Sequence, residues 1–420
     1  MVLPSLGMPG GDDVNAVVLD VGSANFRAGF AGEDTPRIFQ CTTLRYRSDG
    51  SDDVDMTRGE RPKGVPANYF VASAHSSLRE AVSTDGKTGM VDIDKEVLSD
   101  ILHYSFRSSS GFRVDPADSP IMLTEPNKTS VKYRKACLET VFEEFNFPAA
   151  SLLKRAIGSA FAVGKTSGLV VDVGASLTSF APIYEGFSLQ KPLMEFPQIG
   201  GDLLDSILDE ILKKKKIPVS PYYKAQPVSE EYLAKSRLAV VRELKHELCR
   251  LSLTPLSNVA GYASWNLQTD EETRGKLPDG TVVELGGLGQ VIPELLFDPT
   301  PIRAIPNMSQ FVGSFSGIPT CAIECINSCD VDVRKQVASD LILTGGSSLF
   351  SAFPERLAKA MAGSGKCKVT ATPVNVERMS SSWLGSSILA SCATFQQMWV
   401  SRGQFEEEGA DRVSNRQLFW

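Results

Sequence analysis

Two segments of the chain carry the same local pattern, an apolar run that ends in Asp-Val-Gly, then small polar residues and a second apolar run. Residues 17–30 read VVLDVGSANFRAGF, and residues 169–180 read LVVDVGASLTSF. A buried strand that ends in a carboxylate and turns through glycine brings backbone N–H groups together with an acid, here Asp20 or Asp172. Such a turn suits a phosphate with its metal ion. Two copies in one chain predict two half-domains that close on one nucleotide.

The composition limits the class of protein. The chain has 420 residues, of which 42% are hydrophobic and 22% charged, enough for the cores of two sizeable domains. Its net charge of −7 argues against direct, broad binding of nucleic acid, which needs a clustered basic face. No apolar run reaches the roughly 18 residues of a membrane helix, and the first residues lack the features of a signal peptide. Eight scattered Cys favour a reducing compartment, so we expect the nucleus or the cytoplasm.

Strand-like and helix-like patterns alternate along the chain, which predicts an α/β fold. The spacing of apolar residues predicts helices over residues 94–106, 133–145, 151–163, 202–212, 354–362 and 386–399. A short strand is expected at 121–123, and a third glycine turn, at 344–348, follows the apolar residues 341–343. Neither GxGxxG nor GxxxxGK[ST] is present, and a hairpin directly after a buried strand differs from the Rossmann arrangement.

Four longer segments resemble one known family. VVLDVGSANFRAGFAGEDTPR, SGLVVDVGASLTSFAPIYEGFSL, LILTGGSSLF and SSWLGSSILASCATFQQMWVS are similar to segments of actin and the actin-related proteins, and the resemblance covers nearly the whole chain. It implies an actin-like ATPase fold with two related lobes, or four subdomains, around a nucleotide cleft. Within the family, Arg27 and the segments NVERMSSSWLGSSILAS and LPDGTVVEL are most similar to the nuclear actin-related proteins of chromatin-remodelling and histone-acetyltransferase complexes.

The resemblance also implies a division into subdomains. The base of the outer lobe would comprise residues 14–41, 85–160 and 380–420, with residues 42–84 as a small outer subdomain. The base of the inner lobe would comprise residues 161–198 and 301–379, with residues 199–300 at its top. Residues 1–13 read as a flexible tail, and residues 45–68, rich in Ser, Asp, Gly and charge, as a mobile loop.

A nucleotide site at the glycine turns is the main functional implication. The residues carried over from the family are Asp20, Gly22, Ser23, Arg27, Asp172, Gly174, Thr178, Gly200, Gly201, Asp202, Lys245, Gly345, Gly346 and Phe350. The cofactor would be ATP or ADP with Mg²⁺, which Asp20 and Asp172 would hold through water. Residues 200–202 would reach the ribose, Lys245 the adenosine, and the turn with Gly345, Gly346 and Phe350 both the phosphates and the adenosine.

Some positions depart from the family pattern where water would attack the nucleotide. Ala175 stands in place of a second acid, Ser179 in place of a His that helps to order the water, and Arg155 in place of the Gln that positions it. A Gln amide both donates and accepts hydrogen bonds, whereas Arg only donates. We therefore expect ATP to be a structural ligand with little or no hydrolysis, and we assign no catalytic residue. Further departures near the nucleotide are Ala24, His246 and Met379.

The resemblance also implies a hydrophobic cleft in which helices of partner proteins dock. Its residues here would be Phe161, Ala162, Thr166, Ile388, Leu389 and Met398. The expected partners are a helix of a remodelling ATPase, actin or another actin-related protein, other chromatin-complex subunits and histones, with the nucleus as the location. A cytoskeletal filament protein is the first alternative, which the divergent 45–68 loop disfavours. An actin-fold ATPase or sugar kinase is the second, but no Asp stands in a recognisable catalytic setting.

Three further features have a structural and a functional interpretation. Cys321, Cys325 and Cys329 recur every four residues, which would suit a metal, but no nearby fourth ligand is present, so burial is the better interpretation. The run 213–216 of four Lys would suit a nuclear localisation signal or a DNA contact, but is more typical of a solvated helix end. His75, His103 and His246 lie far apart in sequence and suggest no shared site.

Overall fold

Two sheets of related topology form the framework of the chain. The computed structural model describes residues 16–45, 78–107, 111–220, 230–268, 273–305, 308–364 and 367–415. The first sheet has the order β18-β9-β8-β1-β2-β3. Its strands are β1 (Val17–Val21), β2 (Asn25–Phe30), β3 (Ile38–Cys41), β8 (Ile121–Glu125), β9 (Ala149–Lys154) and β18 (Val400–Ser401).

The second sheet repeats the plan of the first. Its order is β12-β11-β10-β16-β17, and β13 also pairs with β11. Its strands are β10 (Gly168–Val173), β11 (Leu177–Tyr184), β12 (Phe187–Ser188), β13 (Met194–Pro197), β16 (Asp340–Thr344) and β17 (Lys368–Thr370). In each sheet an antiparallel hairpin, β1–β2 or β10–β11, is followed on one side by two parallel strands. The α/β class and the two expected hairpins are thus confirmed.

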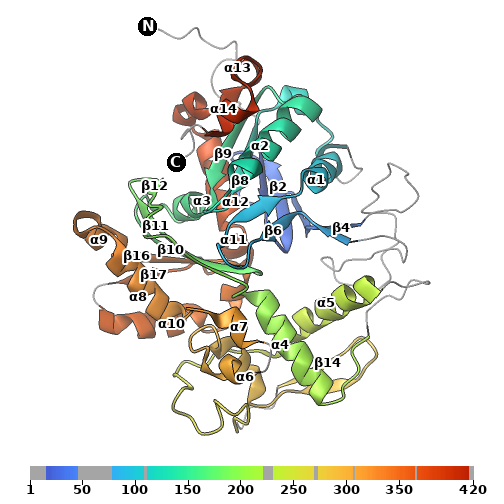
Figure 1. Ribbon diagram of the computed structural model, residues 1–420, viewed down its shortest axis with the longest axis vertical. Helices are drawn as coiled ribbons and strands as arrows, with labels where there is room; N and C mark the ends of the chain where they lie inside the picture. The colour runs from blue at the N-terminus through green and yellow to red at the C-terminus, as the bar shows by residue number, and fades with distance from the viewer. Residues whose placement is uncertain are drawn as a thin grey trace.

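Helices cover the faces of the sheets, as parallel strands require. Around the first sheet lie α1 (Lys95–Arg107), α2 (Val131–Glu139), α13 (Arg402–Glu408) and α14 (Ala410–Asn415), seen in the upper part of Figure 1. Beside the second sheet lie α8 (Ile318–Ser328), α9 (Val331–Val337) and α10 (Phe353–Met361). To the right of these in the view are α4 (Gly201–Lys214), α5 (Glu230–Leu248), α6 (Leu288–Glu294) and α7 (Ser309–Val312).

Short elements complete the described part of the chain. Three two-stranded sheets are formed by β4 (Thr43–Arg45) with β5 (Leu78–Glu80), β6 (Val82–Thr84) with β7 (Val91–Ile93), and β14 (Arg274–Lys276) with β15 (Val282–Glu284). A π-helical turn (Thr140–Glu144) extends α2. The 3₁₀ turns are Pro116–Asp118, Thr300–Ala304, Gly346–Leu349, Ala362–Ser364 and Ala393–Met398. No helix in these described segments is both long and apolar enough to cross a membrane.

The two sheets are joined through α3 (Arg155–Ala162) and α12 (Ser381–Ser391), while α11 (Asn375–Met379) leads into α12. Each sheet has its own hydrophobic core. A third core cluster combines Val18 and Met122 of the first sheet with Val170 and Ile342 of the second, together with Trp383 of α12. Trp383 is fully buried, and its indole N–H donates to the Val18 carbonyl at 3.0 Å. The two halves therefore share apolar packing at their junction.

The expectation of a helix over residues 151–163 is wrong at its start. Residues Ala149–Lys154 form strand β9, every residue of which is buried, and the helix begins only at Arg155. The strand pairs in parallel with β8. A continuous apolar run fits a fully buried strand and a buried helix equally well, so periodicity could not separate them.

The expected amphipathic helix over residues 386–399 is also placed wrongly. Helix α12 begins at Ser381 and ends at Ser391, because Cys392 is extended, with φ −75° and ψ 129°. A 3₁₀ turn follows over Ala393–Met398. Apart from Trp383 and Ala390, the buried residues of α12 are small Ser and Gly residues, so most of its buried side has no apolar signature in the sequence.

Several sequence-based expectations fall on parts of the chain that are not described. The tail at 1–13, nearly all of the loop at 45–68 and His75 lie outside the described residues. The boundaries assigned to the four subdomains remain a prediction.

Candidate functional site

In the turns of both hairpins, the carbonyl groups accept hydrogen bonds from neighbouring segments, whereas some of the amide groups have no acceptor in the described chain. In the first turn, Thr42 donates through its backbone N–H to the Ala24 carbonyl (3.1 Å) and through its hydroxyl to the Ser23 carbonyl (3.0 Å). The N–H groups of Ser23 and Ala24 themselves have no acceptor within the described chain. Free amides at the end of a buried strand are suited to an anion.

The second turn is arranged in the same way. The amide of Gly201 donates to the Gly174 carbonyl at 3.0 Å, and that of Asp202 to the Ala175 carbonyl at 2.9 Å. The amide of Gln198 donates to the carbonyl of Ser176 at 2.7 Å. Again the N–H groups of the turn, those of Ala175 and Ser176, are without an acceptor in the described segments.

The third glycine turn closes against the second hairpin. Gly345 has a φ of +91°, and a β-carbon there would lie 2.4 Å from Asp172 Oδ1, so only glycine fits. The Ser347 hydroxyl donates to the Gly174 carbonyl at 2.8 Å. The fold thus brings Asp172, Gly174, Gly345 and Gly346 together, as the sequence predicts. Phe350 packs instead into the core beside the second sheet.

The end of β1 carries a dense charged cluster. Asp20 is buried and accepts hydrogen bonds from Thr124 Oγ1 (2.5 Å), Arg155 Nε (3.2 Å) and Arg27 Nη1 (3.3 Å). Arg155 Nη2 also donates to the Val21 carbonyl. Burial favours the neutral acid, but Arg155 and Arg27 outweigh it and hold the pKa of Asp20 below its ordinary value. Asp20 is therefore charged and already paired.

Asp172 faces the same cluster from the second sheet without pairing directly. Burial raises its pKa, and Asp20 adds to this, while Arg155 and Arg27 oppose it. The cluster thus contains two guanidinium groups, Arg27 and Arg155, and two carboxylates, Asp20 and Asp172. Both oxygens of Asp20 accept hydrogen bonds from protein, so Asp20 is poorly suited to hold the water shell of Mg²⁺. The residues fit a phosphate better than they fit its metal ion.

The position expected to order an attacking water is occupied by a closed hydrogen-bond pair. Ser179 is buried, and its hydroxyl accepts from Asn127 Nδ2 at 3.1 Å. The carbonyl oxygen of the Asn127 side chain accepts from the Ala156 amide at 3.3 Å. A serine hydroxyl and a carboxamide are both weak bases, so neither side chain is suited to take a proton from water.

The residues expected on the ribose and adenosine side tie α4 to its neighbours. Lys245 is buried, and its ammonium group pairs with Asp205 (2.6 Å) and donates to the Gly201 carbonyl (2.9 Å). Arg242 bridges Asp202 (2.7 Å) and Asp205 (2.8 Å). The hydroxyl of Thr178 donates to the Ile199 carbonyl at 2.8 Å. These side chains hold the start of α4 against the second hairpin.

Glycine is required at the start of α4 because that helix approaches the second turn closely. A β-carbon at Gly200 would lie 2.4 Å from the Ala175 carbonyl oxygen, and one at Gly201 would lie 2.7 Å from Ser347 Oγ. The turn of the second hairpin, the third glycine turn and the start of α4 are therefore packed on one another.

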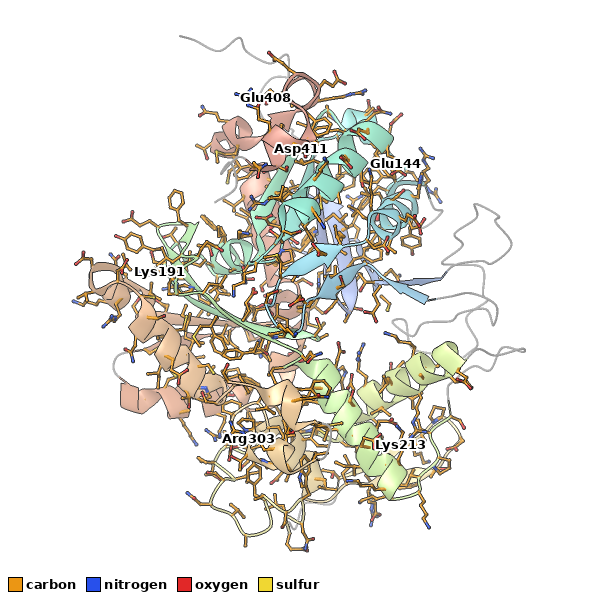
Figure 2. All side chains as sticks on the ribbon, viewed as in Figure 1. Glu144, Lys191, Lys213, Arg303, Glu408 and Asp411 are labelled. Carbon is orange, nitrogen blue, oxygen red and sulfur yellow. The ribbon has the colours of Figure 1, made fainter. Side chains whose placement is uncertain are left out.

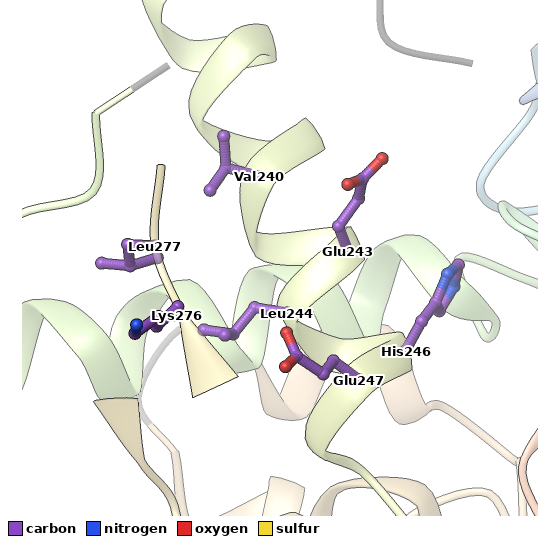
Figure 3. Close-up of a pocket in the computed structure, with 7 residues that line it drawn as sticks. All are labelled: Val240, Glu243, Leu244, His246, Glu247, Lys276 and Leu277. Carbon is purple, nitrogen blue, oxygen red and sulfur yellow. The ribbon is translucent and has the colours of Figure 1, made fainter. Parts of the chain in front are cut away.

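A separate pocket of about 400 Å³ lies beside α5 and the end of β14 (Figure 3). It is lined by Val240, Glu243, Leu244, His246, Glu247, Lys276 and Leu277. His246, a departure from the family pattern, lines this pocket next to the buried Lys245. Met379, another departure, lies about 4.0 Å from the position of a β-carbon on Gly346 and so borders the third turn.

The residues expected to form a partner cleft gather around α3 and α12. Phe161, Leu389 and Met398 are partly buried and pack against the core cluster that joins the two sheets. Ile388 is 40% exposed. Ala162 ends α3, and Thr166 is exposed in the following loop, where its carbonyl accepts from the Gly186 amide at 2.8 Å. The residues expected to form the cleft thus lie along the edge of the core cluster that joins the two sheets.

The cysteines, the lysine run and His103, for which the sequence left a functional interpretation open, have ordinary structural roles or lie at the surface. Cys321, Cys325 and Cys329 are buried, and the described residues contain no group of three or more side chains that could hold a metal. The four Lys at the end of α4 are exposed, and Lys213, labelled in Figure 2, pairs with Asp209 and Glu210 at 2.8 Å. His103 lies 3.6 Å from Glu144 at the surface.

Some residues of the site were not expected from sequence. Thr124 contacts Asp20 although the two lie 104 positions apart, and Asp205 and Arg242 organise the Lys245 contacts. The signal for Thr124 was its place at the carboxyl end of a strand parallel to β1, where side chains of neighbouring strands meet. The charges of Asp205 and Arg242 gave no such signal, because each lies within an ordinary amphipathic helix.

Two sheets of the same plan share one core cluster, and each carries a hairpin that turns through glycine after a buried Asp-bearing strand. This arrangement defines a two-lobed protein of the actin type. The chain belongs to the actin family, whose sequence profile, described as Actin, matches residues 11–418. It is similar to the protein named Actin-related protein 4 of Oryza sativa subsp. indica, with 32% identity over 451 aligned residues that cover 97% of this chain and 100% of that protein.

Two fungal proteins of the same name are also similar to this chain. That of Schizosaccharomyces pombe (strain 972 / ATCC 24843) is 32% identical, with coverage of 96% of this chain and 97% of that protein. That of Yarrowia lipolytica (strain CLIB 122 / E 150) is 28% identical, with coverage of 99% of each. The similarity to proteins named Actin-related protein 4 therefore spans nearly the full chain.

Proposed function

We propose that this protein is a scaffold subunit that binds a nucleotide as a structural ligand and docks helices of partner proteins. The observation that carries the nucleotide part is the pair of hairpin turns, each with backbone N–H groups that have no acceptor in the described chain. Arg27 and Arg155 lie beside Asp20 at the first hairpin, and the third glycine turn packs on the second. Phosphates would accept from these amides and from the guanidinium groups. The nucleotide would bridge the two lobes.

The same surroundings favour binding without hydrolysis. In-line attack needs a group that orients and deprotonates water. Arg155 can only donate hydrogen bonds, and Ser179 and Asn127 are paired with each other. We therefore assign no catalytic residue.

Membership in chromatin complexes is the second part of the proposal. Support comes from the near full-length similarity to proteins named Actin-related protein 4 and from the partly exposed apolar residues on α3 and α12. An amphipathic partner helix would dock its apolar side there. Nuclear location, a remodelling ATPase helix, actin or a related chain, and histones belong to the same proposal.

An ATP turnover assay tests the nucleotide part. Purified full-length protein should retain ATP through gel filtration and release no more phosphate than a no-protein control. Turnover comparable to that of actin filaments would contradict the non-hydrolytic role.

Affinity purification followed by mass spectrometry tests the partners. Co-purification of a remodelling ATPase, histone-acetyltransferase subunits or RuvB-like helicases is expected. Recovery of cytoskeletal proteins instead, together with salt-induced pelleting of the pure protein, would favour the filament alternative.

A further inference from the structure

We propose that the Arg155 guanidinium replaces the divalent cation at the junction of the two hairpins, so that this protein binds a nucleoside polyphosphate without a metal ion. The inference rests on the proposed nucleotide site and adds how that site balances phosphate charge. It departs from the expectation that Mg²⁺ accompanies the nucleotide.

Arg155 is fixed in place by the fold. It is the first residue of α3, directly after β9, and its side chain is 17% exposed. The residue before it, Lys154, pairs with the fully buried Glu125 at 2.8 Å, which fixes the junction of β9 and α3. Arg155 then donates through Nε to Asp20 and through Nη2 to the Val21 carbonyl. The guanidinium therefore sits at the end of β1.

One edge of the guanidinium remains available. Within the described chain, Arg155 Nη1 makes no hydrogen bond, whereas Nε and Nη2 are both engaged. A planar guanidinium can bind a carboxylate on one edge and a phosphate oxygen on another. The arrangement suits an internal cation that bridges Asp20 and a phosphate, as a hydrated metal ion would.

The charges around Arg155 disfavour an added metal. Asp20 accepts from Thr124, Arg155 and Arg27, so both of its oxygens are used. The second hairpin offers one acid, Asp172, because position 175 is Ala. With two guanidinium groups against two carboxylates, the cluster has no excess negative charge to attract a divalent cation.

Isothermal titration of the full-length protein with ATP tests the inference. In buffer with EDTA, the dissociation constant should lie within about threefold of the value in millimolar Mg²⁺. A loss of affinity of tenfold or more in EDTA would overturn the proposal, because the metal would then carry the phosphate contact.

Substitution of Arg155, with the same titrations in Mg²⁺ and in EDTA, provides a second test of the inference. Arg155→Gln removes the charge but keeps a polar side chain, so ATP binding should become at least tenfold tighter in Mg²⁺ than in EDTA. Arg155→Lys retains a cation and should stay metal-independent. Arg402→Gln, on an exposed α13 pair with Glu406, is the matched control and should behave as the unmodified protein. ATP binding by Arg155→Gln that is indifferent to Mg²⁺ would overturn the proposal.

Titration with Mn²⁺ alone, followed by electron paramagnetic resonance, separates the inference from the proposed function. The unmodified protein should leave Mn²⁺ free, whereas Arg155→Gln should bind about one ion. If no nucleotide binds to either protein, the proposed function fails, and this titration still decides the role of Arg155. Mn²⁺ bound by the unmodified protein, or by neither protein, would overturn the inference. If Arg155→Gln does not fold, the comparison of EDTA with Mg²⁺ on the unmodified protein decides it.

Discussion

At the scale of single residues, burial and pairing together set the charge of each acid near the junction of the two sheets. Glu195 of β13 differs from Asp20 because no guanidinium of the described residues pairs with it. Its two carboxylate oxygens are shielded from solvent, and burial raises its pKa to about 7 although Lys128 and Lys154 oppose the shift. The folded protein therefore holds a proton on Glu195 at pH values where an unfolded chain has released it.

Glu195→Gln should reduce the pH dependence of stability. Because the folded pKa is about 7 and the ordinary value is 4.5, the free energy of unfolding falls as pH rises through this window. Gln cannot ionise, so the variant should exceed the unmodified protein by about 1–3 kcal/mol at pH 8 and by much less at pH 5. Urea unfolding at both pH values measures this. Glu406→Gln on exposed α13 is the control, and an equal gain at both pH values would contradict the prediction.

At the scale of elements, contacts between helices fix the junction. Helices α3 and α12 cross so closely that a β-carbon on Gly385 would lie 1.7 Å from the Gly158 carbonyl oxygen. One on Gly158 would lie 2.5 Å from the carbonyl oxygen of Ser382. Small residues on both helices thus allow the two sheets to share one core.

Gly385→Ala should separate these helices. The added methyl meets backbone, which cannot rotate away, so we expect a loss of about 3 kcal/mol or more in the free energy of unfolding. Urea denaturation measures the loss. Gly363→Ala, at a position where no atom of the described residues lies within 4 Å of the new carbon, should change stability little. Equal effects of the two substitutions would refute the close crossing.

The contact between α4 and α5 depends on a buried ion pair. Lys245→Met leaves Asp205, which is 2% exposed, with Arg242 as its one charged partner among the described residues. Loss of a partner from a buried pair is costly, and we expect about 2–4 kcal/mol. Lys213→Met, which removes a 52% exposed lysine of α4, is the matched control and should cost under about 1 kcal/mol. Thermal unfolding distinguishes the two.

At the scale of the whole molecule, the two sheets meet through one core cluster and through the charged cluster of Asp20, Arg27, Arg155 and Asp172 at the ends of the hairpin strands. A ligand that contacts all three turns binds the folded chain but not the unfolded one, so it stabilises by mass action.

ATP should therefore raise the unfolding temperature. At a free concentration 100-fold above its dissociation constant, ATP would add about 2.7 kcal/mol to the free energy of unfolding. AMP is the matched control, because without the β- and γ-phosphates it cannot span the turns. Differential scanning fluorimetry measures both, and a shift of equal size with AMP would show that the turns do not hold the phosphates.

Much of the framework could be predicted because its signals are local. The hairpins at Asp20 and Asp172 and the turn at Gly345 were predicted correctly, since a strand followed by glycine is encoded in adjacent residues. Strand β9 was taken for a helix because burial on both faces removes the periodicity that separates the two. Helix α12 was misplaced because the small residues that face its core do not look apolar.

By itself, the sequence determined the family, the α/β class and the three turns, because these depend on neighbouring residues. Only the tertiary structure decided the partners of the charged groups. Arg155 reaches Asp20 across 135 positions because β9 and β8 run parallel beside β1 and set the start of α3 at its end. A hydrogen bond over such a distance is created by strand order, which no local pattern encodes.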